Sequence, residues 1–248
     1  MRKITINLAA VAAFCIVVAS PALVSSSCAT PKTEQEDTTI IREDSGITAL
    51  KYSSPEVPAS IEFCGKTIDL SRFDRHERMD RELLAFTYMH STSLQMLKKA
   101  NRYFPIVELI LKENGIPDDF KYLMVIESNM NPTARSSAGA AGLWQFMQGT
   151  GRDYGLEVNN NVDERYHIEK ATRAACRYLK DAYAKYKDWV AVAASYNAGQ
   201  ARIASQLAKQ DVDDSLDLQL VEETARYVYR ILAAKQLFNA PQELFLRL

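Results

Sequence analysis

The chain has 248 residues, of which 47% are hydrophobic and 25% are charged, a composition typical of a globular protein with one main domain. Its 30 basic and 31 acidic residues give a formal net charge of −1. This balance argues against the basic footprint of a nucleic-acid-binding protein and against a polybasic membrane-binding patch.

The first 28 residues have the organisation of an export signal. Two basic residues precede an apolar run over 8–19, which is too short for a comfortable transmembrane helix and is typical of a cleaved peptide. The residues that end at Cys28 resemble a lipoprotein processing site, which makes Cys28 a candidate for lipidation. Ser25 stands where such sites usually have leucine, and cleavage after Ala22 without lipidation is the alternative.

A segment rich in Thr, Ser, Glu, Asp and Pro follows at 29–60, and its lack of periodicity predicts a flexible tether. The alternation of apolar and polar residues over 61–70 allows a short β-hairpin with Cys64 and Gly65 at its turn. Cys64 and Cys176 could form a disulfide in an oxidising compartment. No pattern in the sequence brings them together, and we favour two buried thiols.

Helical periodicity accounts for most of the remaining chain. It predicts helices over about 78–100 and 103–113, so that 61–105 forms a mainly helical N-terminal extension. Four later helices are expected at 168–186, 189–197, 201–209 and 221–238. The last helix carries an apolar stripe that should pack over the core, formed by Tyr227, Val228, Ile231, Leu232, Ala234 and Phe238. No strong strand pattern follows residue 70, and the predicted fold class is therefore mostly α.

The stretch 116–150 places one carboxylate, Glu127, near the end of an apolar helix. That helix should begin at Pro117, which suits a first helical position, and should end at 129–131. Glu127 shares a helix face with three large apolar side chains, those of Phe120, Leu123 and Met124. Burial and the helix dipole both raise the pKa of such a carboxyl group, as a general acid near neutral pH requires. The alternative is an ordinary surface glutamate.

The sequence that starts at Glu127 is similar to that of a known family. It contains the pattern E-S-x-x-N-P-x-A-x-S-x-x-G-A-x-G-L-x-Q-x-M-x-x-T, followed in order by D-E-R, Y-N-A-G and E-T-x-x-Y-V. This series resembles the catalytic segment of the soluble lytic transglycosylases. Its residues are most similar to those of the membrane-bound D-type branch. The resemblance implies a lysozyme-like helical catalytic domain, which we expect over 106–248.

The resemblance also implies a reaction that one carboxyl group can carry out. Such enzymes cleave the β-1,4 bond between N-acetylmuramic acid and N-acetylglucosamine in peptidoglycan without water and leave a 1,6-anhydro end. Glu127 would first act as the acid and then as the base, while the 2-acetamido group of the substrate replaces a second carboxylate. The implied partner is a peptidoglycan glycan strand, and no cofactor or metal is implied.

The matching positions imply seven substrate-binding residues, and a purely structural role is the alternative for Ser136, Met147, Glu223 and Tyr227. Ser136 would hydrogen-bond near the reacting sugar, or else cap a loop turn. Gln145 would line the groove, and Met147 would pack against a sugar or fill the core. The remaining four would contact the substrate or line the catalytic centre, and they are Tyr196, Asn197, Glu223 and Tyr227.

Two other functions compete with this interpretation. A goose-type lysozyme-like hydrolase would need a second carboxylate, for which Asp153 and Glu157 are the candidates, and a non-catalytic peptidoglycan-binding protein would need none. His76, His90 and His167 lack metal-ligand spacing, and we expect no metal site. The predicted location is the periplasm, with a lipid anchor in the outer membrane if Cys28 is modified, and the predicted state is a monomer.

Overall fold

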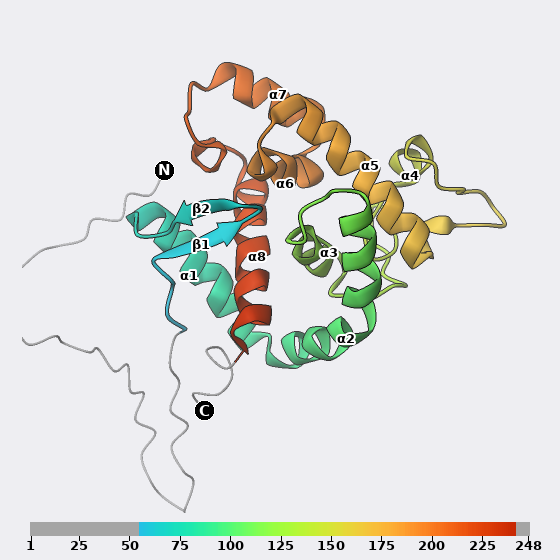
Figure 1. Ribbon diagram of the computed structural model, residues 1–248, viewed down its shortest axis with the longest axis horizontal. Coiled ribbons are helices and arrows are strands. Elements are labelled where there is room, and N and C mark those ends of the chain that lie inside the picture. Colours follow the sequence, from blue (N-terminus) through green and yellow to red (C-terminus); the bar gives the residue numbers. More distant parts are fainter. Residues whose placement is uncertain (1–54, 242–248) are drawn as a thin grey trace, which may run out of the picture. The chain divides into compact units, whose positions relative to one another are not determined.

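The computed structural model describes residues 55–241. The predicted export signal, Cys28 and most of the predicted tether lie outside the described residues. The described elements, shown in Figure 1, are β1 (Ser60–Phe63), β2 (Lys66–Asp69), α1 (Phe73–Tyr88), α2 (His90–Glu113), α3 (Phe120–Ser128), α4 (Gln148–Asp153), η1 (Glu164–Tyr166), α5 (Ile168–Tyr186), α6 (Trp189–Ala198), α7 (Gln200–Lys209), η2 (Ser215–Asp217) and α8 (Glu222–Asn239). The prediction of a mostly α fold is confirmed.

The two strands form the predicted antiparallel hairpin. Ser60 pairs with Asp69 and Phe63 with Lys66, and the turn between them consists of Cys64 and Gly65. Both turn residues have positive φ, 53° and 83°, as a tight two-residue hairpin turn requires. The inward-facing side chains of the hairpin, Ile61, Phe63 and Ile68, are buried.

The break between α1 and α2 falls at Met89, whereas the sequence predicted a continuous helix over 78–100 and a break before residue 103. Within α2 the chain passes through Pro105 without interruption. At Met89 the Thr87 hydroxyl donates to the Leu83 carbonyl at 2.9 Å, a side-chain bond that bends helices. The buried hydroxyl of Ser93 donates to the Phe86 carbonyl at 2.7 Å and joins the two helices across the break.

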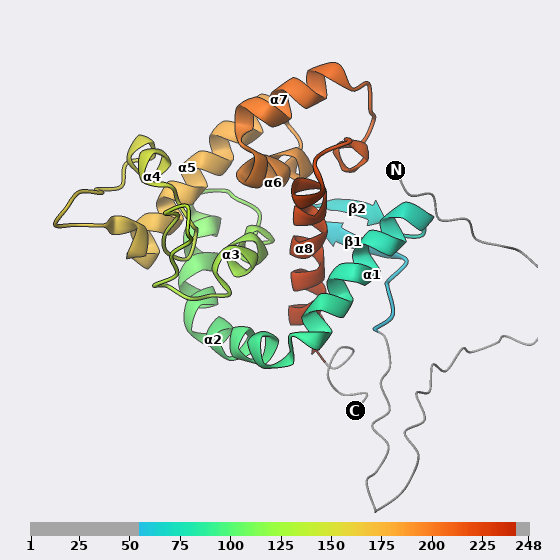
Figure 2. The ribbon, with the colours of Figure 1, turned by 180° about the vertical axis from the view of Figure 1, so that it is seen from behind.

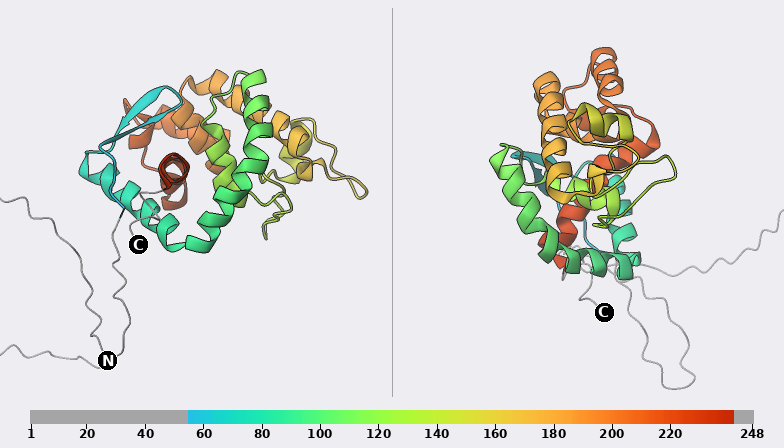
Figure 3. Two further views of the ribbon diagram at one scale, coloured as in Figure 1. Left: turned by 60° about the horizontal axis from the view of Figure 1, so that its bottom comes forward. Right: turned by 90° about the vertical axis from the view of Figure 1, so that its right-hand side faces the viewer.

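Helix α8 lies at the centre of the described unit. The view along its axis in Figure 3 shows the hairpin, α1, α2, α3 and α6 arranged around it, and Figure 2 shows the same arrangement from behind. Its predicted apolar stripe packs into the core: Val228, Ile231 and Leu232 are buried, and the ring of Phe238 lies 5.0 Å from that of Phe104. The predicted role of this helix is therefore confirmed.

Asp119 ties three elements together at the start of α3. One of its carboxylate oxygens pairs with Lys235 of α8 at 2.7 Å, and the other accepts a hydrogen bond from the backbone nitrogen of Cys64 at 2.7 Å. Both charged side chains are mostly buried, with 14% and 13% of their surface exposed. The regular helix begins one residue later, at Phe120, because 117–119 form a preceding turn. The predicted start at Pro117 was three residues too early.

The remaining sequence predictions can be compared directly. Helices α5 to α8 begin and end within one residue of the predicted bounds. Cys64 and Cys176 are both free thiols, of which Cys176 is buried and Cys64 partly buried. Among residues 55–241, no helix has the length and apolar character that crossing a bilayer requires.

Candidate active site

Glu127 is the second-last residue of α3. The helix ends there because Asn129 adopts a left-handed conformation, with φ of 48°, and Met130 follows with φ of 56°. Met130 is fully buried and anchors this reversal. The Glu127 side chain is partly buried, on the helix face that also carries Leu123 and Met124. The predicted position on an apolar face is therefore correct.

The carboxyl group of Glu127 meets the phenol of Tyr227, which lies 100 residues further along the chain. The Tyr227 hydroxyl donates a hydrogen bond to Oε1 of Glu127. Burial raises the pKa of Glu127 to about 7 from its ordinary value of 4.5, against the lowering effects of the Tyr227 hydrogen bond and of the Arg230 charge. Burial also raises the pKa of Tyr227 well above its ordinary value, so this side chain remains a neutral donor.

The loop after α3 carries Ser136, Gln145 and Met147. Ser136 is exposed, and its Oγ accepts the backbone hydrogen bond of Ala140 at 3.0 Å, so it caps the turn as the structural alternative expected. The Gln145 amide donates to the carbonyls of Ala134 and Gly142 at 3.2 and 2.8 Å. Met147 is 46% exposed, and the core-filling alternative for this residue is wrong. Helix α4 follows this loop and begins at residue 148.

A buried arginine holds the shape of this loop. Arg165 is 4% exposed and donates to the carbonyls of Gly139 and Phe146 at 2.8 and 3.0 Å, while Asp163 balances its charge at 2.7 Å. Gly142 packs against the same arginine, with φ of 78°, and an added Cβ there would lie 1.9 Å from the Arg165 carbonyl oxygen. Only glycine fits this position, because both the conformation and the contact exclude a side chain.

Tyr196 and Asn197 lie near the end of α6. The Tyr196 hydroxyl donates to the Trp144 carbonyl at 2.8 Å, and the charge of Glu127 contributes to raising the Tyr196 pKa, although burial is the larger cause. Asn197 accepts a hydrogen bond from the Thr224 hydroxyl at 2.8 Å, which joins α6 to α8. Tyr196 therefore lies close enough to Glu127 for the charge of the carboxylate to act on its phenol, and Asn197 helps to hold α6 against α8.

Helix α8 presents a row of polar side chains to Glu127. Glu223, Tyr227 and Arg230 share one face of the helix, since they are spaced by four and three residues. Glu223 is exposed and its charge raises the pKa of Glu127, whereas the charge of Arg230 lowers it. The sequence analysis missed Arg230, because it lies outside the motif that identified Glu223 and Tyr227.

The two carboxylates considered for a hydrolase, Asp153 and Glu157, are both exposed. The side chain of Glu157 accepts a hydrogen bond from Asn159 at 2.7 Å. Within the part of the chain that the structure describes, no group of three or more His, Cys, Asp or Glu residues could hold a metal ion. The indole of Trp144 is fully buried and donates to Thr172 at 2.9 Å, so it belongs to the core.

The fold and the site define a helical protein with one raised-pKa carboxyl group at a helix end, supported by a buried phenol. In a comparison with known protein families, residues 105–217 match the family described as "Transglycosylase SLT domain". Over this segment, the family resemblance predicted from the sequence is confirmed.

Two curated relatives and one solved structure resemble this chain. The membrane-bound lytic murein transglycosylase D of Escherichia coli K12 is 29% identical over 177 residues, which cover 69% of this chain and 38% of that protein. The membrane-bound lytic murein transglycosylase C of Haemophilus ducreyi is 29% identical over 150 residues, 54% of this chain and 40% of that protein. An inactive mutant of the lytic transglycosylase Slt from Pseudomonas aeruginosa aligns with a TM-score of 0.47 and 24% identity over 59% of this chain and 25% of that one. The chain thus spans about two fifths of the curated relatives.

Replacing Gly142 by alanine should destabilise the protein by about 2 kcal/mol or more, because the new Cβ would collide with the Arg165 carbonyl in a conformation that alanine avoids. Gly149 is the matched control: it lies in α4 with nothing within 4 Å of an added Cβ, and Gly149→Ala should leave stability unchanged or raise it slightly. Thermal unfolding followed by circular dichroism compares the two. Equal melting temperatures for both variants would contradict the assigned role of Gly142.

Replacing Glu127 by glutamine should stabilise the protein at pH 8 but not at pH 4. The folded protein keeps the Glu127 proton up to a pH of about 7, whereas the unfolded chain releases it near pH 4.5. Wild-type stability therefore falls as the pH rises through this window, by up to about 3 kcal/mol for this group, and the variant lacks that loss. Urea denaturation of both proteins at the two pH values measures the difference in their free energy of unfolding. This difference should be larger at pH 8 than at pH 4.

Proposed function

We propose that this protein is a peptidoglycan lytic transglycosylase in which Glu127 is the catalytic acid and base. The observation that carries the proposal is the pairing of a partly buried Glu127, with a pKa raised to about 7, to the buried phenol of Tyr227. Membership of residues 105–217 in the transglycosylase SLT domain family supports the reaction class, as do the relatives named lytic murein transglycosylases.

The raised pKa suits both halves of the reaction. Glu127 would give its proton to the oxygen of the β-1,4 bond as the bond from that oxygen to C1 of N-acetylmuramic acid breaks. The 2-acetamido oxygen would stabilise C1 until the 6-hydroxyl oxygen of the same sugar bonds to it and returns a proton to the Glu127 carboxylate. No water is consumed, and the enzyme ends in its starting protonation state. A group with a pKa near the working pH reaches both forms readily.

Tyr227 would act by fixing the carboxyl group. Its hydroxyl occupies Oε1 of Glu127, and we therefore assign the transferred proton to Oε2. Tyr196, Asn197 and Glu223 would contact the sugar or support those contacts around this centre. Gln145 and Ser136 would act through their loop, whose backbone they hold, and the exposed Met147 would pack against a sugar face.

We further propose that the protein is exported to the periplasm, acts on peptidoglycan strands as a monomer and, if Cys28 is lipidated, is tethered to the outer membrane. The export signal predicted over 1–28 and the tether predicted over 29–60 support this arrangement. The relatives are named membrane-bound, which agrees with an envelope location.

The deciding experiment is mass spectrometry of the soluble products formed from purified peptidoglycan. The protein should release fragments with anhydromuramoyl ends, and Glu127→Gln should lower their yield about 10²-fold or more, because no group remains to protonate the leaving oxygen. Reducing ends, heavier by one water, would indicate the goose-type hydrolase instead. Binding to peptidoglycan without products from either protein would indicate the non-catalytic alternative.

Tyr227→Phe should move the alkaline limb of the pH profile of kcat/KM upward by about one unit. This limb reports loss of the Glu127 proton, and the deleted hydrogen bond favours the carboxylate form. The shape of the side chain is preserved, so the melting temperature serves as the control for folding. An alkaline limb that stays in place or moves downward would exclude this role for Tyr227.

A further inference from the structure

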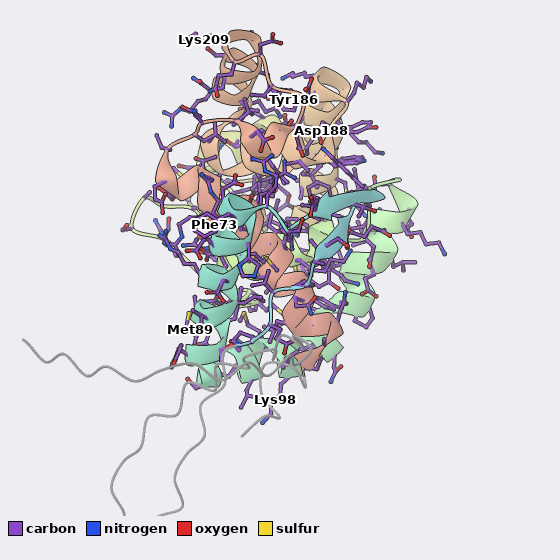
Figure 4. The ribbon with its side chains drawn as sticks, turned by 90° about the vertical axis from the view of Figure 1, so that its left-hand side faces the viewer. Phe73, Met89, Lys98, Tyr186, Asp188 and Lys209 are labelled. Carbon is purple, nitrogen blue, oxygen red and sulfur yellow. The ribbon has the colours of Figure 1, made fainter. Side chains whose placement is uncertain are left out.

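Helix α1 places a buried carboxylate against α8. Glu82 is 2% exposed, although it lies in a helix that precedes the matched SLT segment of 105–217. Its Oε1 accepts from Nε of Arg226 at 2.6 Å, and its Oε2 lies 3.6 Å from Nε of Arg230. A carboxylate removed from water needs such cationic partners, since its desolvation is otherwise costly. Figure 4 shows α1 between Phe73 and Met89, beside α8.

The two arginines are held differently. Arg226 makes the short contact with Glu82, and its side chain is 28% exposed. Arg230 makes the longer contact and is 43% exposed, so its guanidinium group is less constrained. Arg230 also acts electrostatically on Glu127, whose phenol partner Tyr227 lies three residues before it on the same helix face. Arg230 is thus a cation shared between two carboxyl groups, one buried on α1 and one in the site.

The positive charge of Arg230 favours the deprotonated form of Glu127, whereas a catalytic acid must be protonated before the reaction. A cation stabilises the carboxylate, whereas Glu127 must carry a proton when substrate binds. The groups that act on Glu127 are Glu223, Tyr227 and Arg230 of α8, and Tyr196 of α6 is affected by Glu127 in turn. Glu223 opposes the effect of Arg230 directly, and Glu82 is placed to oppose it by attracting the guanidinium group toward α1.

We propose that Glu82 is a positioning residue for the reaction, which holds Arg230 beside α1 and so keeps Glu127 protonated until substrate binds. This inference depends on the proposed role of Glu127 as the acid. It assigns a function to the N-terminal extension: α1 supplies the counter-charge that adjusts an acid located in another part of the fold.

The test is a pair of variants with opposite expected effects. Glu82→Gln keeps an acceptor for Arg226 but releases Arg230 toward Glu127, so the alkaline limb of kcat/KM should move downward by about half a unit to one unit. Arg230→Gln removes the cation, and the limb should move upward by a similar amount. A purely structural role for either residue would lower activity without producing opposite shifts.

Arg81→Gln is the matched control, because Arg81 is the exposed neighbour of Glu82 on α1 and pairs with the exposed Glu222. It should leave the pH profile unchanged. If Glu82→Gln fails to fold, Glu82→Asp, which withdraws the carboxylate by one methylene group, should move the limb in the same downward direction. Shifts of the same sign for the Glu82 and Arg230 variants, or none beyond that of Arg81→Gln, would overturn the proposal.

A second readout separates this inference from the proposed function. Carbon-13 NMR titration of the Glu127 carboxyl carbon, assigned with Glu127→Gln, measures the proton affinity of the group without any turnover. Opposite titration shifts in an inactive protein would support the control of Glu127 by Glu82 and Arg230 and would count against the transglycosylase reaction. Normal turnover with unchanged titration would support the reaction and reject the role of Glu82.

Discussion

The site depends on how α3 packs against α8. Two of the side-chain pairs that connect the helices lie at opposite ends of α3: Asp119 with Lys235 at its start, and Glu127 with Tyr227 near its end. Residues 119 and 127 are separated by the same number of positions as 227 and 235, in the opposite direction, so the helices run antiparallel in one fixed register. The ion pair at one end therefore determines that the phenol reaches the carboxyl group at the other.

This dependence means that the matched family segment is not the whole of the site. The segment 105–217 contains Glu127 and its loop, but Tyr227 and Arg230 come from α8, which begins at Glu222. Helix α1 in turn packs against α8 and contributes Glu82. The hairpin joins the same assembly, because the Cys64 backbone nitrogen donates to Asp119. Elements from both ends of the described chain thus position a glutamate in its middle.

The features that could be predicted from the sequence are those that local residue patterns determine. The bounds of α5 to α8, the hairpin turn at Cys64 and Gly65, and the half-buried position of Glu127 all follow from periodicity or turn chemistry within a few residues. The break at Met89 was not predicted, since the hydrogen bond from the Ser93 hydroxyl to the Phe86 carbonyl forms only once the two helices are packed together. Motifs identified Glu127 and Tyr227 separately. Their hydrogen bond, and the ion pairs of Glu82, join residues 100 to 148 positions apart, and no spacing rule reveals such contacts.

Among the described residues, the free cysteines Cys64 and Cys176 have a chemical consequence for the folded domain. Burial raises the pKa of Cys176 to about 11 and that of Cys64 further still, so almost none of either residue is present as thiolate at neutral pH. Thiolate is the species that attacks disulfides and is oxidised to sulfenic acid. Once folded, the domain should therefore resist mixed-disulfide formation and peroxide damage, and its cysteines should become reactive only where the chain opens.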